Sequence, residues 1–246
     1  MDGGKNGGNR DDHAGIAHLA GFTTTRDRAM RRLFAPALLA LLACGPTGEL
    51  LEAQDMTIPD GYEQLLKDNN GRYHKGGWNH YGPGYFELDP ATGVLTSHGG
   101  MGLFWHSVKE FGDFVLELDF LCADENTNSG VFLRVPGVPA SDDYIYHSFE
   151  IQIDDASEGI HHTGAAYDAE APTHLASNPP GEWNHFKITF VGSRLQVELN
   201  GQEVLDWEAE PRGKVEDFAL RGYIGLQNHD DQSPVSFRNI VLMELE

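Results

Sequence analysis

The stretch that decides the fold is Asn128-Ser129-Gly130-Val131-Phe132-Leu133-Arg134, followed further along by Phe149-Glu150-Ile151-Gln152-Ile153-Asp154. Apolar and polar residues alternate in both segments, which predicts two β-strands with one face in a core and the other turned outward. On the second strand the outward side chains are Glu150, Gln152 and Asp154. Two carboxylates and an amide on one rigid strand form a candidate polar site.

The rest of the chain after residue 60 also consists of predicted strands. Segments with a strand pattern cover residues 114–121, 131–135, 148–154, 185–191, 194–199, 222–227 and 235–244. Two hairpins are expected, at Val191-Gly192-Ser193-Arg194 and at Asn200-Gly201, whose residues suit the positive φ angles of a type I′ turn. No amphipathic helix of useful length separates the strands, so they pair antiparallel. The predicted fold class is all-β, an antiparallel β-sandwich or jelly roll.

Composition limits the possible partners. The chain has 246 residues and a formal net charge of -21. This charge would repel the phosphates of nucleic acid and an anionic membrane surface and so disfavours both as direct partners, whereas neutral sugars are compatible with it. The expectation is no nucleic-acid partner, and membrane contact only through a lipid anchor. The apolar fraction of 40% is enough for a packed core.

The N-terminal region differs from the rest. Arg31 and Arg32 precede an apolar run over residues 33–43, and Leu41-Leu42-Ala43-Cys44 resembles a lipoprotein signal-peptidase site. The run is shorter than the roughly 20 residues that span a bilayer, which favours a cleaved export signal over a transmembrane helix. The alternative is an internal apolar helix in a longer N-terminus. The expected organisation is a disordered or doubtful extension (1–29), a signal peptide (30–43), a tether (44–59) and one β-sandwich domain (60–246).

Five motifs follow the two central strands in a defined order. They are Thr163-Gly164-Ala165-Ala166-Tyr167, Gly181-Glu182-Trp183-Asn184, Leu199-Asn200-Gly201, Ile224-Gly225-Leu226-Gln227-Asn228-His229 and Phe237-Arg238-Asn239-Ile240. In this order and rough spacing they resemble the bacterial 3-keto-disaccharide hydrolase domain, over about residues 60–246. The resemblance implies a concanavalin-A-like sandwich whose concave sheet carries the site, and a carbohydrate substrate.

The candidate site residues come from the strand pattern and from the motifs. The expected catalytic residues are Glu150, Asp154 and His162, and the expected substrate-binding residues are Arg134, Gln152, Tyr167, Gln227 and His229. Gln227 has the same outward direction as Glu150, and His162 lies in a loop where the family carries a histidine suited to proton transfer. The alternatives are a merely solvated strand face for the carboxylates and a structural ion pair for Arg134.

The spacing of the carboxylates bears on the chemistry. Residues four apart on a regular strand are about 13 Å apart at Cα, which is too far for a glycosidase pair without a bulge or inward-leaning side chains. One base suffices if the sugar carries a ketone at C3, because the ketone acidifies the C2 proton and an enolate can expel the C1 substituent. Arg134, Gln152 or a divalent cation would then steady the oxyanion.

Two other functions and the cofactor stay open. The protein could be a non-catalytic carbohydrate-binding module of laminin-G type or a two-carboxylate glycosidase. Oxygen ligands from Glu150, Asp154 or Asp155 suit Ca²⁺ or Mg²⁺, and an added histidine would suit Mn²⁺ or Zn²⁺, but the sequence does not choose among these ions.

We predict that residues 30–43 are removed on export and that Cys44 becomes the lipid-bearing N-terminus, outside the cytoplasm in the periplasm or on the outer surface. Intact-mass analysis of protein extracted from membranes should show a lipid-modified chain that begins at Cys44, and Cys44→Ser should release the protein from the membrane. An unprocessed N-terminus, or unchanged membrane retention of the variant, would contradict the prediction.

Overall fold

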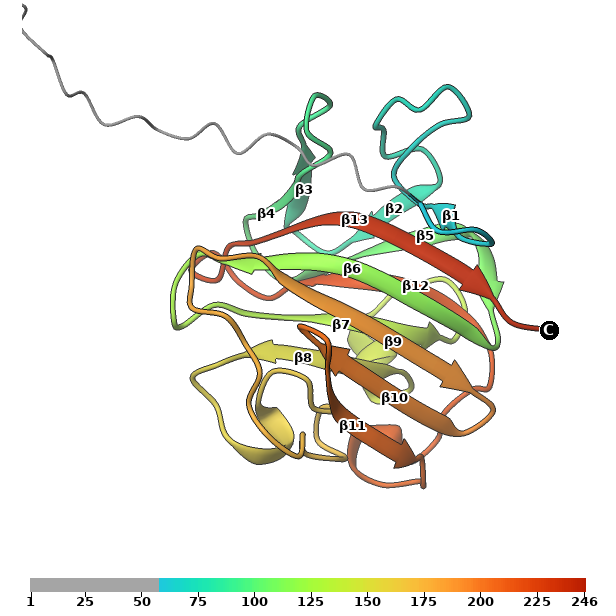
Figure 1. Cartoon of the computed structure of the whole chain (residues 1–246), viewed down its shortest axis with the longest axis vertical. Coiled ribbons are helices and arrows are strands. Elements are labelled where there is room, and N and C mark those ends of the chain that lie inside the picture. Colours follow the sequence, from blue (N-terminus) through green and yellow to red (C-terminus); the bar gives the residue numbers. More distant parts are fainter. Residues whose placement is uncertain (1–57) are drawn as a thin grey trace, which may run out of the picture. The chain divides into compact units, whose positions relative to one another are not determined.

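Residues 58–246 are the part of the chain that the structure, a computed structural model, describes (Figure 1). The expected signal peptide, Cys44 and nearly all of the tether 44–59 lie outside these residues. No helix within the described part is long and apolar enough to cross a membrane.

The described residues form strands joined by turns and three short 3-10 helices. The strands are β1 (Glu63–Gln64), β2 (Trp78–Tyr81), β3 (Tyr85–Leu88), β4 (Leu95–His98), β5 (Gly102–Phe111), β6 (Phe114–Cys122), β7 (Asn128–Val135), β8 (Phe149–Asp154), β9 (Asn184–Val191), β10 (Arg194–Leu199), β11 (Gln202–Glu208), β12 (Gly222–Asn228) and β13 (Val235–Glu244). The 3-10 helices are η1 (Asp142–Tyr146), η2 (Gly159–His161) and η3 (Gly213–Val215).

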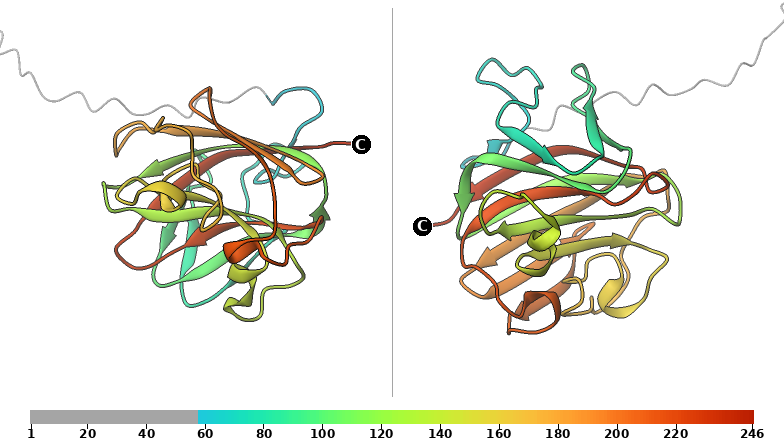
Figure 2. Two further views of the ribbon diagram at one scale, coloured as in Figure 1. Left: turned by 90° about the horizontal axis from the view of Figure 1, so that it is seen from below. Right: turned by 180° about the vertical axis from the view of Figure 1, so that it is seen from behind.

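Two antiparallel sheets pack face to face (Figures 1 and 2). The larger has the order β11-β10-β9-β6-β13-β4-β3, with β1 paired to β13, and the smaller has the order β2-β5-β12-β7-β8. Each pair of neighbouring strands is antiparallel. The predicted all-β antiparallel sandwich is therefore confirmed, and both expected hairpins are present, with Asn200 at φ 52° and Gly201 at φ 76°.

The core lies between the sheets and is rich in phenylalanine. Phe149, Ile151 and Ile153 of β8 are fully buried there, and the ring of Phe149 meets that of Phe190 from β9 edge-on, with centroids 4.8 Å apart. Burial of each such side chain contributes about 1.5–3 kcal/mol to folding. The apolar residues of β8 thus hold the strand against the larger sheet and turn its polar residues away from the core.

A second apolar cluster covers the outer side of the smaller sheet. It consists of Leu103, Trp105, Phe132, Val135 and Tyr144. Tyr144 comes from η1, which lies across this side of the sheet (Figure 2), and its ring packs edge-on against Phe132 with centroids 5.2 Å apart. The outer face of this sheet is therefore covered by loops and is not simply solvated.

The free edge of β8 is also covered. The segment 163–167 runs along it, so that the Gln152 N–H donates to the Ala165 carbonyl at 3.0 Å and the Tyr167 N–H donates to the Glu150 carbonyl at 2.9 Å. An edge strand with unpaired backbone groups invites aggregation, and this pairing removes that risk. It also places Tyr167 beside Glu150.

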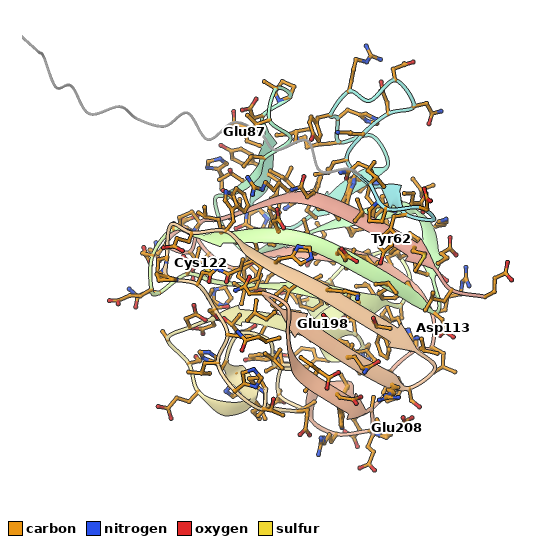
Figure 3. The ribbon with its side chains drawn as sticks, viewed as in Figure 1. Tyr62, Glu87, Asp113, Cys122, Glu198 and Glu208 are labelled. Carbon is orange, nitrogen blue, oxygen red and sulfur yellow. The ribbon has the colours of Figure 1, made fainter. Side chains whose placement is uncertain are left out.

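Arg134 departs from the sequence expectation. Its φ of 54° breaks the alternation of β7, and its fully buried side chain lies between the sheets, with the guanidinium 3.6 Å from the centre of the Phe190 ring. The guanidinium donates to the carbonyls of Gly112 and Gly192 and to Asp113, which is labelled at the end of the sandwich in Figure 3. The prediction that Arg134 lies near Glu150 is wrong, because the left-handed residue turns its side chain into the core.

We predict that Arg134→Met lowers the free energy of unfolding by about 3–5 kcal/mol, because two carbonyls and a carboxylate lose their buried donor. Urea unfolding measures this loss. The matched control is Arg194→Met, which removes an exposed pair with Asp206 and should leave the free energy of unfolding nearly unchanged, because solvent screens such a pair. A variant that keeps its stability would show that Arg134 does not clamp the sheets.

Candidate functional site

A small cavity opens on the outer side of the smaller sheet, over β7, β8 and β12. It has a volume of about 120 Å³. Its lining residues are Met101, Asn128, Ile145, Glu150, Gln152, Tyr167, Lys214, Gln227 and His229. Five of the residues expected from the sequence thus meet in one place: Glu150, Gln152, Tyr167, Gln227 and His229.

Glu150 is the one carboxyl among the described residues that line this cavity, and its pKa is strongly shifted. Its side chain is 6% exposed and lies over Gly130, where an added Cβ would come within 2.4 Å of Oε1. Burial raises the pKa of Glu150 to about 8, against the opposing effects of the Lys214 charge and a hydrogen bond from Gln227. A carboxyl with a pKa near neutrality, in a cavity, is suited to proton transfer.

Two amide groups provide polar contacts beside Glu150. Gln152 and Gln227 are 2% and 7% exposed, and the Oε1 atom of each has no hydrogen-bond partner among residues 58–246. A buried acceptor without a protein donor costs free energy, and the hydroxyl of a ligand can supply the missing donor. The site is therefore arranged to receive hydrogen-bond donors, as a sugar offers them.

Lys214 completes the cavity and was not among the expected residues. It lies in η3, and its Nζ is 4.1 Å from the centre of the Tyr167 ring, a cation–π distance. It supplies the positive charge that acts on Glu150. The segment around it has no strand period, so alternation could not reveal it; the one sequence signal is a lysine among the acidic residues of 208–217.

Asp154 lies outside the cavity wall. Its Oδ1 accepts from the backbone N–H groups of Ala156 and Ser157, and its Oδ2 accepts from the Asn128 amide at 3.1 Å and from the Ser157 hydroxyl at 2.7 Å. Three of these hydrogen bonds hold the turn that follows β8, and the fourth ties Asp154 to the start of β7. The structure therefore does not bring Asp154 to Glu150 as a second reactive carboxylate, because its oxygens already anchor this turn.

His162 is also separate from the cavity. Its ring is buried, with Nδ1 2.8 Å from the Ser157 carbonyl and Nε2 3.7 Å from Asp155. It does not appear among the lining residues of the cavity. The expected pairing of His162 with Glu150 is thus not seen, because the loop turns the ring toward residues 155–157.

The oxygen ligands considered for a cation are not brought together. Across residues 58–246, no group of three or more His, Cys, Asp or Glu side chains is arranged to hold a metal ion. Glu150 lies in the cavity, while Asp154 is bound by its turn and Asp155 faces His162. The donor set suggested by the sequence does not fit a metal site.

A larger cavity, of about 530 Å³, lies elsewhere, on the larger sheet beside the β3–β4 hairpin that carries Glu87 (Figure 3). Trp183 and Arg238 line it, with the guanidinium 4.0 Å from the centre of the indole ring. Arg238 also donates to Asp119 at 3.0 Å. Two of the sequence motifs therefore meet here, in a stacked pair that is held by a buried carboxylate and lies apart from Glu150.

The match to a family model decides the family. The model described as 3-keto-alpha-glucoside-1,2-lyase-like domain matches residues 61–243. The chain belongs to this family. The matched residues cover nearly all of the described sandwich, including the Glu150 cavity and Lys214, so the resemblance found in the sequence is confirmed. No curated protein matches the chain.

Solved structures agree with the fold of the lyase-like domain. Two proteins of Parabacteroides distasonis that carry the provisional name glycosyl hydrolase match it: one at 26% identity and a TM-score of 0.61, over 75% of this chain and 99% of that chain, and one at 22% identity and a TM-score of 0.61, over 77% and 99%. A Bacillus subtilis protein of unknown function with a galectin-like fold matches at 12% identity and a TM-score of 0.51, over 74% and 98%. The family and the likeness at 26% identity support a carbohydrate-active protein, and the other two likenesses show the fold alone.

We predict that Glu150→Gln stabilises the lyase-like domain and that the gain grows with pH. The pKa of Glu150 is raised from 4.5 to about 8, so between these values the folded protein keeps a proton that the unfolded chain releases, and stability falls as pH rises. At about 1.4 kcal/mol per pH unit, the full cost above pH 8 is about 5 kcal/mol. Glutamine removes this cost, so urea unfolding should show no gain at about pH 4 and the largest gain at about pH 9.

The matched control is Glu125→Gln, at an exposed residue of the turn after β6. Its effect on the free energy of unfolding should not grow with pH. Equal pH dependence in the two variants would show that Glu150 is not a destabilised carboxylate.

Proposed function

We propose that this protein cleaves 3-keto-glycosides, with Glu150 as the base that removes the C2 proton. The observation that carries this proposal is the buried Glu150 carboxyl, 6% exposed, whose pKa is raised to about 8 in a cavity lined by amides and one lysine. A general base works best when its pKa lies near the working pH. The family assignment supports the substrate class.

The reaction needs one base and one electrophile. Glu150 takes the proton from C2, and the electrons of that bond form an enolate with the ketone at C3. The enolate then expels the C1 oxygen, which leaves a double bond between C1 and C2 and restores the ketone. Lys214 offers a positive charge to the enolate oxygen, since its ammonium acts on the same small volume as Glu150.

The remaining polar residues of the cavity bind the sugar hydroxyls and protonate the leaving group. The Oε1 atoms of Gln152 and Gln227 accept hydrogen bonds from sugar hydroxyls. His229, whose Nδ1 lies 2.8 Å from Asp230 Oδ2, is the candidate donor of a proton to the departing C1 oxygen. Water that adds at C1, with a proton returned to C2, completes a net hydrolysis; release before this addition makes the reaction a lyase reaction.

The same geometry disfavours the two alternatives. A two-carboxylate glycosidase needs a second reactive carboxyl, and among the cavity-lining residues Glu150 is the sole carboxylate. A binding module has no need of a carboxyl that costs stability when it ionises, because exposed hydroxyls and amides bind sugars without that cost.

We also propose that the enzyme is exported and anchored through Cys44. The basis is the sequence of residues 30–44, a basic start followed by a short apolar run that ends in Leu-Ala-Cys. Such a location would give the site direct access to glycosides outside the cytoplasm.

We predict that the wild-type protein cleaves a 3-keto-disaccharide far faster than the parent disaccharide, because without the ketone the C2 proton is not acidic. Glu150→Gln should lower kcat by about 10²- to 10⁴-fold, the usual contribution of proton transfer. In deuterated water, the released 3-keto-sugar should carry deuterium at C2. The value of kcat/KM should rise with pH through the pKa of Glu150, about 8, since the base must be ionised.

The control variant is Glu203→Gln, on the exposed side of β11, which should keep wild-type kinetics. Equal rates on oxidised and unoxidised substrates, without label at C2, would exclude the elimination and favour direct glycosidic cleavage.

A further inference from the structure

A second cavity borders the Glu150 cavity at Lys214. It has a volume of about 460 Å³ and is lined by Tyr146, His147, Asp168, Gly213, Lys214, Glu216 and Asp217. Lys214 lines both cavities, and its Nζ is 4.1 Å from the centre of the Tyr167 ring on one side and 5.7 Å from the centre of the Tyr146 ring on the other. The two cavities thus share one wall.

The volumes of the two cavities suggest that each receives a different part of the substrate. The Glu150 cavity, at about 120 Å³, is smaller than the roughly 300–1,000 Å³ typical of small-molecule sites, whereas its neighbour falls within that range. The Glu150 cavity therefore receives the reacting edge of one sugar ring, and the rest of a larger substrate must extend beyond it. The space beyond Lys214 is available for that part.

The neighbouring cavity has the surface of a sugar-binding site. Tyr146 is 58% exposed, which is high for a large aromatic side chain and leaves its ring open to a ligand. Tyrosine combines an apolar ring face, which packs against the C–H groups of a sugar, with a hydroxyl that can hydrogen bond. The contact with Lys214 steadies this ring next to the reaction centre.

The charges around this cavity select among ligands. Asp168, Glu216 and Asp217 offer carboxylate oxygens that can accept hydrogen bonds from neutral sugar hydroxyls, and Lys214 is the lysine of the lining. An anionic group such as a uronate would meet three like charges against one opposite charge. Neutral ligands are therefore favoured over anionic ones.

We infer that this cavity is the leaving-group subsite, and that it binds a neutral sugar attached to C1 of the 3-keto ring. The inference rests on the proposed function for the identity of the reacting ring. Tyr146 is the platform of the subsite, and Asp168, Glu216 and Asp217 set its selectivity.

The test compares two substrates that differ only in the leaving group: a 3-keto-disaccharide that releases glucose, and methyl 3-keto-glucoside, which releases methanol. Tyr146→Ala should raise KM for the disaccharide about tenfold, the scale of one lost aromatic contact, and leave KM for the methyl glycoside unchanged. Tyr85→Ala is the matched control, because Tyr85 is similarly exposed, at 56%, but lies on β3. It should change neither KM.

A third substrate tests the charge selectivity. A 3-keto-glycoside that releases glucuronate should be cleaved more slowly by the wild-type protein than the one that releases glucose. The double variant Glu216→Gln and Asp217→Asn should narrow this difference. Equal effects of Tyr146→Ala on both glucoside substrates, or equal cleavage of the glucose and glucuronate compounds by wild type, would overturn the inference.

Binding separates this inference from the proposed function. In the Glu150→Gln background, calorimetry with the same 3-keto-disaccharide and methyl 3-keto-glucoside should show that Tyr146→Ala weakens the affinity for the disaccharide alone. If wild type turned over neither compound and this difference in affinity persisted, the proposed function would fail and the subsite would stand. If wild type turned over both compounds but Tyr146→Ala weakened both affinities equally, the proposed function would stand and the subsite would fail.

Discussion

Burial of the edge strand β8 on both faces is the constraint on which the site depends. Its apolar face packs into the sandwich, its polar face lies under loops, and its free edge pairs with residues 163–167. A carboxylate on an ordinary outward face would be solvated and would have an ordinary pKa. Here Glu150 loses most of its contact with water, while Lys214 and Gln227 offset only part of the cost. The raised pKa of Glu150 thus follows from the loops and the backbone pairing that cover the edge strand β8.

Alternation in the sequence predicted the strands and the shared direction of Glu150, Gln152 and Gln227, because side-chain direction on a strand follows a period of two. The expected position of Arg134 near Glu150 came from the family motif and not from alternation, and a positive φ that no pattern reveals turns this side chain into the core instead. Alternation could not predict the cover over the polar face, since η1 and η3 are short turns without a period and come from distant parts of the chain. For the same reason Lys214 and Tyr146 escaped notice, whereas Tyr167 and His229 were found through the motifs.

The two carboxylates of β8 show how one strand separates structural from chemical roles. Asp154, at the end of the strand, has hydrogen-bond donors for both oxygens and serves to anchor the next turn. Glu150, four residues earlier, has one amide donor and a nearby lysine. Their chemical type and outward direction are the same. They differ in the number of hydrogen-bond donors that surround each carboxyl group. Several of these donors come from loops, so the difference can be seen only in the structure.

Gly130 has a consequence beyond the packing of β7. It lies across from Gln152 in the sheet register, and the space of its absent side chain is occupied by the Glu150 carboxyl. The glycine and the glutamate therefore act together: because Gly130 has no side chain, the Glu150 carboxyl on the neighbouring strand can lie close to the backbone of β7. A distantly related protein can keep every polar residue of the cavity and still differ here. With a residue larger than glycine at the position of Gly130, its carboxyl would have to lie in a different position. The pairing of a small residue with a glutamate on the neighbouring strand is thus a criterion for recognising this arrangement in other sandwiches.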